Sequence, residues 1–260
     1  MRTLHPVNMF RQNQNEKIVV YVGALYPYKG FHILAKHWRE IKKNVKGAKL
    51  WVIGSAKLYG DHVSLGRYGI AEASYEKQFI HYLLNSNGQI DDSVTFFGNL
   101  GGSEKEKIVS QATVGVFNPS GNSETFGLSG VEFEAMGIPV VSIYKNSALD
   151  IIKHKKTGLL YKKEEEFPEY VIRLLNDETY NHLLGEQGKA FVSEEFDSKK
   201  IVQEWHEAIC CVAMDLPYKL KHSRGIMKDN QIWLHHIDNF LRENTNIKNF
   251  FWESKIVTGS

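Results

Sequence analysis

The 260-residue sequence has few of the features that place a protein in a special class. Its only two cysteines, Cys210 and Cys211, are adjacent, and such a pair cannot form a disulfide framework. We therefore expect reduced thiols that are buried on a helix, in a cytoplasmic protein. No apolar run approaches the roughly 18 residues that can span a bilayer, and no signal peptide is visible. The sequence thus predicts no transmembrane segment.

The chain also lacks a strong charge of either sign. Lys and Arg number 32 and Asp and Glu 30, a formal net charge of +2, which gives no electrostatic argument for a nucleic-acid partner. There is no Asp-x-Asp motif to bind a divalent metal, and no Gly-x-Gly-x-x-Gly follows the first predicted strand. The adjacent His235 and His236 would diverge on a helix, so they are poor joint ligands. We expect neither a metal site nor a dinucleotide-dependent oxidoreductase.

Short apolar segments alternate with amphipathic ones from Ile18 onward. This alternation predicts an α/β fold, a doubly wound, Rossmann-like parallel sheet that is covered on both faces. The predicted strands are 18–23, 49–54, 93–97, 113–118, 139–143 and 158–161. The predicted helices are 30–44, one near 69–85, 103–111 with a Ser103/Glu106 capping box, 127–136, 147–154, 165–176, 178–193 and 198–214. We expect a linker at 1–16, the sheet domain at 17–197, and C-terminal helices and a tail at 198–260.

The most informative stretch, residues 118–137, contains Glu124 and Glu132. It follows an apolar, β-branched run typical of a buried strand and leads into a helix. A helix N-terminus offers unpaired N–H groups and a positive dipole end, which suit a phosphate, and carboxylates accept hydrogen bonds from sugar hydroxyls. The stretch therefore predicts a nucleotide-sugar site. The spacing alone is weak evidence, because Glu178 and Glu186 are also eight residues apart.

Helical spacing predicts which side of the 127–136 helix is buried. Leu128, Val131 and Ala135 would form the buried stripe. Glu132 would border that stripe, whereas Glu134 would point towards water. The plain alternative for Glu132 is a solvated acid at the edge of the helix.

Three loops, 23–30, 98–102 and 119–127, each follow a predicted strand, so all belong on the carboxyl edge of the sheet, where doubly wound folds bind ligands. Lys29 precedes a helix, where the dipole disfavours a cation unless an anion binds there; a solvated lysine is the alternative. The small residues Gly98, Asn99, Gly101 and Gly102 would let a flat base approach the backbone closely. A tight turn before the next helix explains these residues nearly as well.

These stretches together resemble the donor domain of retaining, GT-B type glycosyltransferases of family 4 (glycosyl transferases group 1). The family pattern is Pro-Ser, Glu, Phe-Gly-Leu, seven residues between the acids, and Glu-Ala-Met-x-Gly-x-Pro-Val. Further similar stretches are Val-Tyr-Val-Gly-Ala-Leu-Tyr-Pro-Tyr-Lys-Gly at 20–30, Val-Thr-Phe-Phe-Gly-Asn at 94–99 and Thr-Gly-Leu-Leu at 157–160. The match runs in order over roughly residues 17–214. It is specific for the donor domain but not for one sugar.

The resemblance implies roles for individual residues. Lys29 would bind the donor diphosphate, and Glu124 would contact the transferred sugar, which makes these two the catalytic candidates. The implied donor-binding residues are Glu132, for the ribose, and Phe126, Gly127, Leu128, Gly23, Gly98, Asn99 and Ser120. The substrate would be a nucleoside-diphosphate sugar, with a UDP-sugar favoured and no separate cofactor, and Lys29 with the helix end would assist departure of the diphosphate in place of a metal.

One position departs from the family. Ala24 stands where the family usually has an arginine, which removes a charge-assisted phosphate contact worth roughly 1.5–3 kcal/mol. Arg67 and Lys57, in the irregular segment before the second helix, are candidates to replace it.

The resemblance also implies a second, acceptor-binding domain, which these 260 residues do not contain. The chain would then be a fragment, or half of a split enzyme with a separate acceptor-domain protein as its partner. Trp233, Ile237, Phe240 and Leu241 keep helical spacing and would dock a partner or pack on this domain. The resemblance implies a saccharide or a lipid-linked acceptor and a role in surface polysaccharide synthesis. Peripheral contact with a membrane stays open. The alternatives are a non-catalytic donor-binding or regulatory subunit, and a sugar-nucleotide epimerase or phosphorylase.

Overall fold

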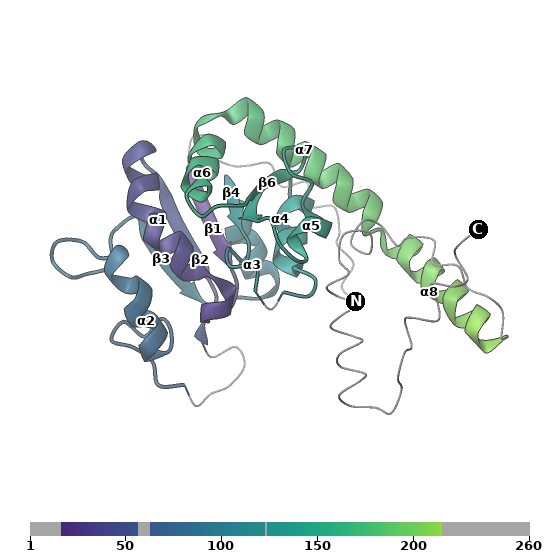
Figure 1. The fold of residues 1–260 in the computed structure, drawn as a ribbon, viewed down its shortest axis with the longest axis horizontal. Coiled ribbons are helices and arrows are strands. Elements are labelled where there is room, and N and C mark those ends of the chain that lie inside the picture. Colours follow the sequence, from purple (N-terminus) through teal and green to yellow (C-terminus); the bar gives the residue numbers. More distant parts are fainter. Residues whose placement is uncertain (1–16, 57–62, 123, 215–260) are drawn as a thin grey trace. The chain divides into compact units, whose positions relative to one another are not determined.

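The computed structural model describes residues 17–56, 63–122 and 124–214 (Figure 1). The chain divides into two compact units, residues 1–204 and 205–260. Of the second unit only residues 205–214, the end of the last helix, are described, so the architecture below is that of the first. The predicted linker, Lys57, the histidine pair and the apolar residues between 233 and 241 lie outside the described residues.

The first unit is built on a six-stranded parallel sheet with the strand order β3-β2-β1-β4-β5-β6. This confirms the predicted doubly wound, Rossmann-like fold. The strands are β1 (Ile18–Val22), β2 (Lys49–Ile53), β3 (Val94–Gly98), β4 (Val114–Val116), β5 (Val140–Ile143) and β6 (Gly158–Tyr161).

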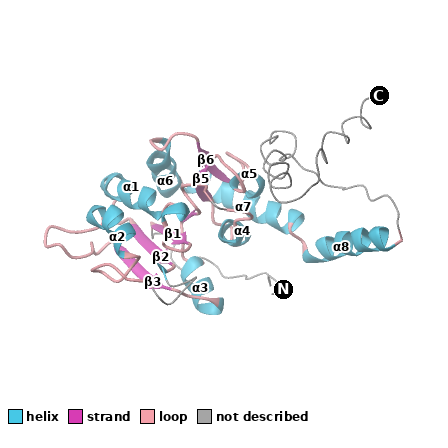
Figure 2. Cartoon of the chain, turned by 60° about the horizontal axis from the view of Figure 1, so that its bottom comes forward, coloured by secondary structure: helices cyan, strands magenta, loops and turns pink. Residues whose placement is uncertain are grey.

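Helices connect the strands and cover both faces of the sheet (Figure 2). The described helices are α1 (Phe31–Asn44), α2 (Ala73–Phe79), α3 (Gly102–Val109), α4 (Leu128–Ala135), α5 (Ala148–Ile151), α6 (Glu166–Asn176), α7 (Glu178–Glu195) and α8 (Ser198–Ala213), and α8 has no buried residue. A short 3-10 turn, η1 (Pro27–Lys29), precedes α1, and another, η3 (Ile80–Tyr82), follows α2. None of the helices in the described part of the chain is both long and apolar enough to cross a bilayer.

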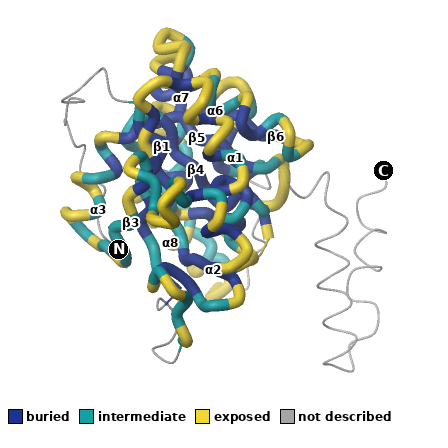
Figure 3. Tube along the Cα trace, turned by 90° about the vertical axis from the view of Figure 1, so that its left-hand side faces the viewer, coloured by how far each residue is buried: buried dark blue, intermediate teal, exposed yellow. Residues whose placement is uncertain are grey.

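The core has two halves, one on each face of the sheet, because successive side chains of a strand point to opposite faces. In β1, Val19 and Tyr21 pack into the cluster under α1, α2 and α6, whereas Ile18 and Val20 pack into the cluster under α3, α4 and α5. Figure 3 shows the result: β1, β4 and β5 are mostly buried, the edge strand β3 is only partly buried, and exposed residues lie along the helices. Because both faces are covered, each central strand is a continuous apolar run.

Strand order sets the place where a ligand can bind. β1 pairs with β2 on one side and with β4 on the other, so the chain winds in opposite directions from this point. Doubly wound folds bind ligands at the carboxyl edge where the winding reverses. The loop after β1 and the loop after β4, which carry Lys29 and Glu124, therefore lie side by side.

Two predictions of local structure were wrong. The helix expected near 69–85 is only the seven residues of α2 followed by η3, because the buried carboxylate of Glu76 accepts hydrogen bonds from the N–H groups of Tyr68, Ile70 and Ala71 and holds that segment as a loop. The Ser103/Glu106 capping box is absent. α3 begins one residue earlier, after Gly101, with no side-chain cap.

The expectation for the thiols was also wrong. Cys210 and Cys211 are free and partly exposed on α8 rather than buried. The sulfur of Cys210 lies 3.8 Å from Nε2 of His206, one turn earlier on the same helix.

Candidate functional site

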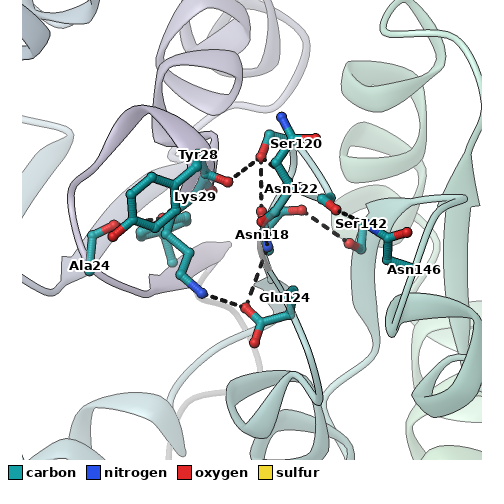
Figure 4. Close-up of polar contacts among 11 residues, drawn as sticks. Ala24, Tyr28, Lys29, Asn118, Ser120, Asn122, Glu124, Ser142 and Asn146 are labelled. Carbon is teal, nitrogen blue, oxygen red and sulfur yellow. Dashed lines mark hydrogen bonds and ion pairs between the residues drawn. The ribbon is translucent and has the colours of Figure 1, made fainter. Parts of the chain in front are cut away.

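The loops after β1 and β4 touch at Gly30 and Ser120. Gly30 has a φ of 74°, and a Cβ placed there would lie 2.4 Å from the backbone nitrogen of Ser120. Only glycine satisfies both the backbone conformation and this close approach. The hydroxyl of Ser120 donates to the carbonyl of Tyr28, which joins the two loops a second time (Figure 4).

The same two loops bring Lys29 and Glu124 together. Lys29 Nζ lies 2.7 Å from Glu124 Oε2, although 95 residues separate them, and the two side chains are only 15% and 17% exposed. The hydroxyl of Tyr21 donates to the Lys29 carbonyl over 3.2 Å. Burial raises the pKa of the Tyr21 phenol well above its usual value, so it keeps the proton that it donates. The two residues that we expected to be catalytic thus form one preorganised ion pair.

Helix α4 begins immediately after this pair. Its N-cap, Gly127, has a φ of 87°, and a Cβ there would lie 2.5 Å from Cζ of Phe117, so this position needs glycine. The flanking side chains of Phe126 and Leu128 are 46% and 61% exposed. Phe126 makes an edge contact with Phe196, with ring centroids 5.6 Å apart. The helix end is therefore bordered by apolar side chains, and the prediction that Leu128 is buried was wrong.

The second expected acid, Glu132, is paired with a residue that the sequence analysis missed. Lys105 Nζ of α3 lies 2.6 Å from Glu132 Oε1, and the side chains are 21% and 22% exposed. Each of the two acids thus has its own lysine, Lys29 for Glu124 and Lys105 for Glu132. Nothing in the local sequence singles out Lys105, because the two partners are 27 residues apart and on different helices.

The third acid of this stretch, Glu134, is buried rather than solvated, which corrects our prediction. Its side chain is fully inaccessible, and Oε1 accepts a 2.6 Å hydrogen bond from the Thr157 hydroxyl. Oε2 has no hydrogen-bond partner among the described residues. Burial is the main cause that raises the pKa of Glu134 to about 8, against the weaker opposing effects of Thr157 and Lys153. α4 is covered on this side by Gly188 of α7, whose missing side chain lets the two helices approach.

The remaining donor-binding candidates line the carboxyl edge next to β2. The Gly23 N–H donates to the Ile53 carbonyl over 3.0 Å, and the Gly54 N–H donates to the Gly98 carbonyl over 2.7 Å. Gly98 has a φ of 70°, and a Cβ there would have no atom within 4 Å. Asn99 is exposed. The loop is open at this point, as a base pocket requires, and its assignment to the base stays a prediction.

Of the two candidates for a replacement phosphate cation, the structure describes only Arg67. Ala24 is buried, at 2% exposure. The Arg67 guanidinium lies 5.8 Å from the centre of the Tyr68 ring, and the Tyr68 N–H donates to Glu76 of α2. The residue next to Arg67 is thus bonded to α2, and a role for Arg67 at the diphosphate stays a prediction.

No group of three or more His, Cys, Asp or Glu side chains that could hold a metal ion occurs in residues 17–56, 63–122 and 124–214.

Comparison with known proteins gives the family. The model of the family described as Glycosyl transferases group 1 matches residues 8–191. Among individual proteins, the capsular polysaccharide biosynthesis glycosyltransferase CapM of Staphylococcus aureus is 24% identical over 197 residues, which cover 73% of this chain and 45% of CapM. The chain spans about half the length of the relatives that it matches.

Solved structures agree on the fold. The crystal structure of Anabaena Alr3699/HepE in complex with UDP-glucose superposes with a TM-score of 0.61 at 20% identity, covering 75% of this chain and 49% of that one. The C-terminal domain of the glycosyl transferase group 1 protein LpcC from Francisella tularensis gives 0.57 at 17% identity, covering 70% of this chain and 88% of that one. The fold is therefore that of the donor half of a GT-B architecture, and the chain belongs to the glycosyl transferases group 1 family.

Proposed function

We propose that this chain is the donor-binding half of a retaining glycosyltransferase that uses a nucleoside-diphosphate sugar without a metal ion. The observation that carries the proposal is the Lys29–Glu124 ion pair at the carboxyl edge between β1 and β4. It combines a cation for a diphosphate with a carboxylate for sugar hydroxyls, at the edge where this fold binds ligands.

In the proposed reaction the bond between the anomeric carbon and the diphosphate oxygen breaks, and its electron pair goes to the diphosphate. The acceptor hydroxyl attacks from the same face, its oxygen bonds to the anomeric carbon, and its proton goes to the departing diphosphate. The ammonium of Lys29 has three donors, so it can keep Glu124 in place while it binds the departing diphosphate. Preorganised charge of this kind stabilises the negative charge that develops as the leaving group departs. The N-terminus of α4 adds its positive dipole end.

The two acids have different proposed roles. Glu124, beside the diphosphate cation, accepts hydrogen bonds from hydroxyls of the transferred sugar. Glu132, one turn inside α4, accepts from the ribose hydroxyls. Lys105 holds Glu132 Oε1 at 2.6 Å, and one carboxylate can accept several hydrogen bonds, so this ion pair fixes the carboxylate and still leaves room for two hydroxyls.

We further propose the partners of the reaction. A UDP-sugar is the favoured donor, since the similar fold of Alr3699/HepE was solved with UDP-glucose. The acceptor is a saccharide or a lipid-linked saccharide in surface polysaccharide synthesis, as the name of CapM suggests for that protein. A second domain, in the same protein or in a partner, would bind this acceptor, because the relatives are about twice as long. The proposed location is the cytoplasm, where nucleotide sugars would meet the site.

One observation favours a second candidate, a donor-binding subunit without turnover. Ala24 occupies the position of the family arginine and is buried. The departing diphosphate would then have one cation fewer, which weakens stabilisation of the leaving group more than it weakens binding.

Calorimetric titration of the 260-residue chain with UDP-, GDP- and ADP-sugars tests the proposal. We expect binding of a UDP-sugar, weakened about tenfold or more in Glu132→Ala, since hydrogen bonds to a carboxylate are worth roughly 1.5–3 kcal/mol. Glu186→Ala, which removes an exposed acid of α7, should bind like wild type. Slow hydrolysis of the bound donor supports a transferase half, whereas binding without turnover supports the subunit. If no donor binds, or if Glu132→Ala binds equally well, the proposal is wrong.

A further inference from the structure

Asn118 lies two residues after the end of β4, at the start of the loop that carries Glu124. It is buried, at 3% exposure, and has a φ of 31°. A residue with a side chain rarely adopts a positive φ, and asparagine tolerates it best because its short amide can bond to the nearby backbone. Such a residue bends the chain sharply out of the strand. The positive φ at Asn118 therefore sets the direction in which the following loop leaves the strand.

The Asn118 side chain is connected throughout this loop (Figure 4). Its Nδ2 donates to the Asn122 carbonyl over 3.0 Å and to Glu124 Oε2 over 3.4 Å. Its Oδ1 lies 3.1 Å from the Ser120 hydroxyl oxygen, whose single proton is shared between Oδ1 and the Tyr28 carbonyl. The Asn118 carbonyl accepts from the Gly121 N–H over 3.0 Å. One buried amide thus organises the path of the loop and also touches the carboxylate at its end.

Lys29 and Asn118 hold the same oxygen of Glu124. Lys29 Nζ lies 2.7 Å from Oε2, and the amide nitrogen of Asn118 lies 3.4 Å from it. In Figure 4 the two donors approach Oε2 from different sides, one from each loop. Two donors on one oxygen fix the plane of the carboxylate, which a single flexible lysine does not. Among the described residues, Lys29 and Asn118 both contact Oε2, which leaves Oε1 to accept from a sugar hydroxyl.

We propose that Asn118 is a positioning residue that orients the Glu124 carboxylate toward the sugar of the bound donor. The orientation follows from contacts in the structure, and the meaning of that orientation for the sugar rests on the proposed function. A sugar hydroxyl is recognised by the direction of the carboxylate lone pairs. Loss of the Asn118 amide should therefore weaken binding of the sugar and leave binding of the nucleotide diphosphate almost unchanged.

The chain offers a matched control in Asn146. Asn146 is also an asparagine at positive φ, 51°, and its amide donates to the Gly121 carbonyl over 2.6 Å. It thus ties down the same loop, but from the far side, away from Glu124 (Figure 4). Asn118→Gly and Asn146→Gly both keep a backbone that allows positive φ and remove one amide from this loop. Only the first removes a contact with the carboxylate.

The first arm of the test is structural and needs no ligand. In a crystal structure of Asn118→Gly we expect the Glu124 carboxylate to leave Lys29 or to occupy more than one orientation, and in Asn146→Gly we expect it to keep its wild-type position. Asn118→Asp, which replaces the amide donor by a second carboxylate facing Oε2, should displace Glu124 further. An unmoved Glu124 carboxylate in Asn118→Gly, with the fold intact, overturns the proposal.

The second arm measures affinity by calorimetry. The ligands are UDP-glucose, UDP-N-acetylglucosamine and GDP-mannose, each compared with its nucleotide diphosphate. For the sugar that wild type binds best, Asn118→Gly should lose about fivefold to tenfold in affinity while its affinity for the diphosphate changes less than about twofold. Equal losses for both ligands, or the same loss in Asn146→Gly, would show a general loop defect and overturn the proposal. If wild type binds none of them, the proposed function fails, and the structural arm still decides the role of Asn118.

Discussion

Replacing Glu134 by glutamine should stabilise the chain, and the gain should increase with pH. Glu134 is a fully buried carboxyl that bonds to Thr157 through one oxygen and has no partner for the other among the described residues. Burial disfavours its ionised form and raises its pKa from 4.5 to about 8. Glutamine has nearly the same shape, can still accept from Thr157, and has no charge to bury.

The size of the effect follows from the two pKa values. Between pH 4.5 and about 8 the unfolded chain has released this proton and the folded chain has kept it. The unfolded state then binds fewer protons, so the free energy of unfolding falls as the pH rises through this window and stops falling above it. At 1.36 kcal/mol per pH unit the ceiling is about 5 kcal/mol, and relaxation around the carboxyl makes roughly 2–5 kcal/mol the expected range.

Urea denaturation followed by circular dichroism at pH 5, 7 and 9 measures this difference. We expect Glu134→Gln to exceed wild type only slightly at pH 5 and by the full amount at pH 9. Subtracting the free energy of unfolding of wild type from that of Glu134→Gln at the same pH cancels the contributions of all other titrating groups. The control is Glu186→Gln, a change of the same chemistry at an exposed position of α7, which should show no trend with pH. A stability difference between Glu134→Gln and wild type that is constant across the three pH values would refute the reasoning.

Two further predictions concern the fold that supports the site. Gly30→Ala should destabilise the chain by at least about 2 kcal/mol more than Gly47→Ala. Both glycines have positive φ, but only at Gly30 would a Cβ collide with the backbone of Ser120. Equal losses of stability in thermal denaturation would contradict this. Trp38→Ala should cost about 3–5 kcal/mol, since the side chain is buried and its Nε1 donates to Ser93 over 3.0 Å, and a loss below about 1 kcal/mol by urea denaturation would count against that packing.

The alternation of strands and helices, and with it the edge of the sheet where a ligand would bind, was predictable because it depends on local signals. Apolar runs separated by amphipathic helices indicate a parallel sheet whichever residues later meet. Lys29 and Glu124 follow strands, and the ends of parallel strands share one edge. That these two residues are 2.7 Å apart could not be predicted, since it depends on the close contact of Gly30 with Ser120.

The buried side of α4 shows where local reasoning failed. Helical spacing suggested a stripe through Leu128, Val131 and Ala135, whereas the buried residues are Gly130, Val131, Phe133 and Glu134. The stripe is shifted because α4 packs against the sheet and also against α7, which approaches closely at Gly188. A helix covered from two directions has no single solvent face that a period of 3.6 residues would reveal.

The amino-acid sequence by itself determined the alternation of strands and helices, the edge at which a ligand would bind, and the family to which the chain belongs, because each of these follows from short-range patterns. Only the tertiary structure decided which charges meet. It paired Lys29 with Glu124 and Lys105 with Glu132, and it buried Glu134. Contacts between residues far apart in the chain depend on how neighbouring helices pack on the sheet, which no local pattern records.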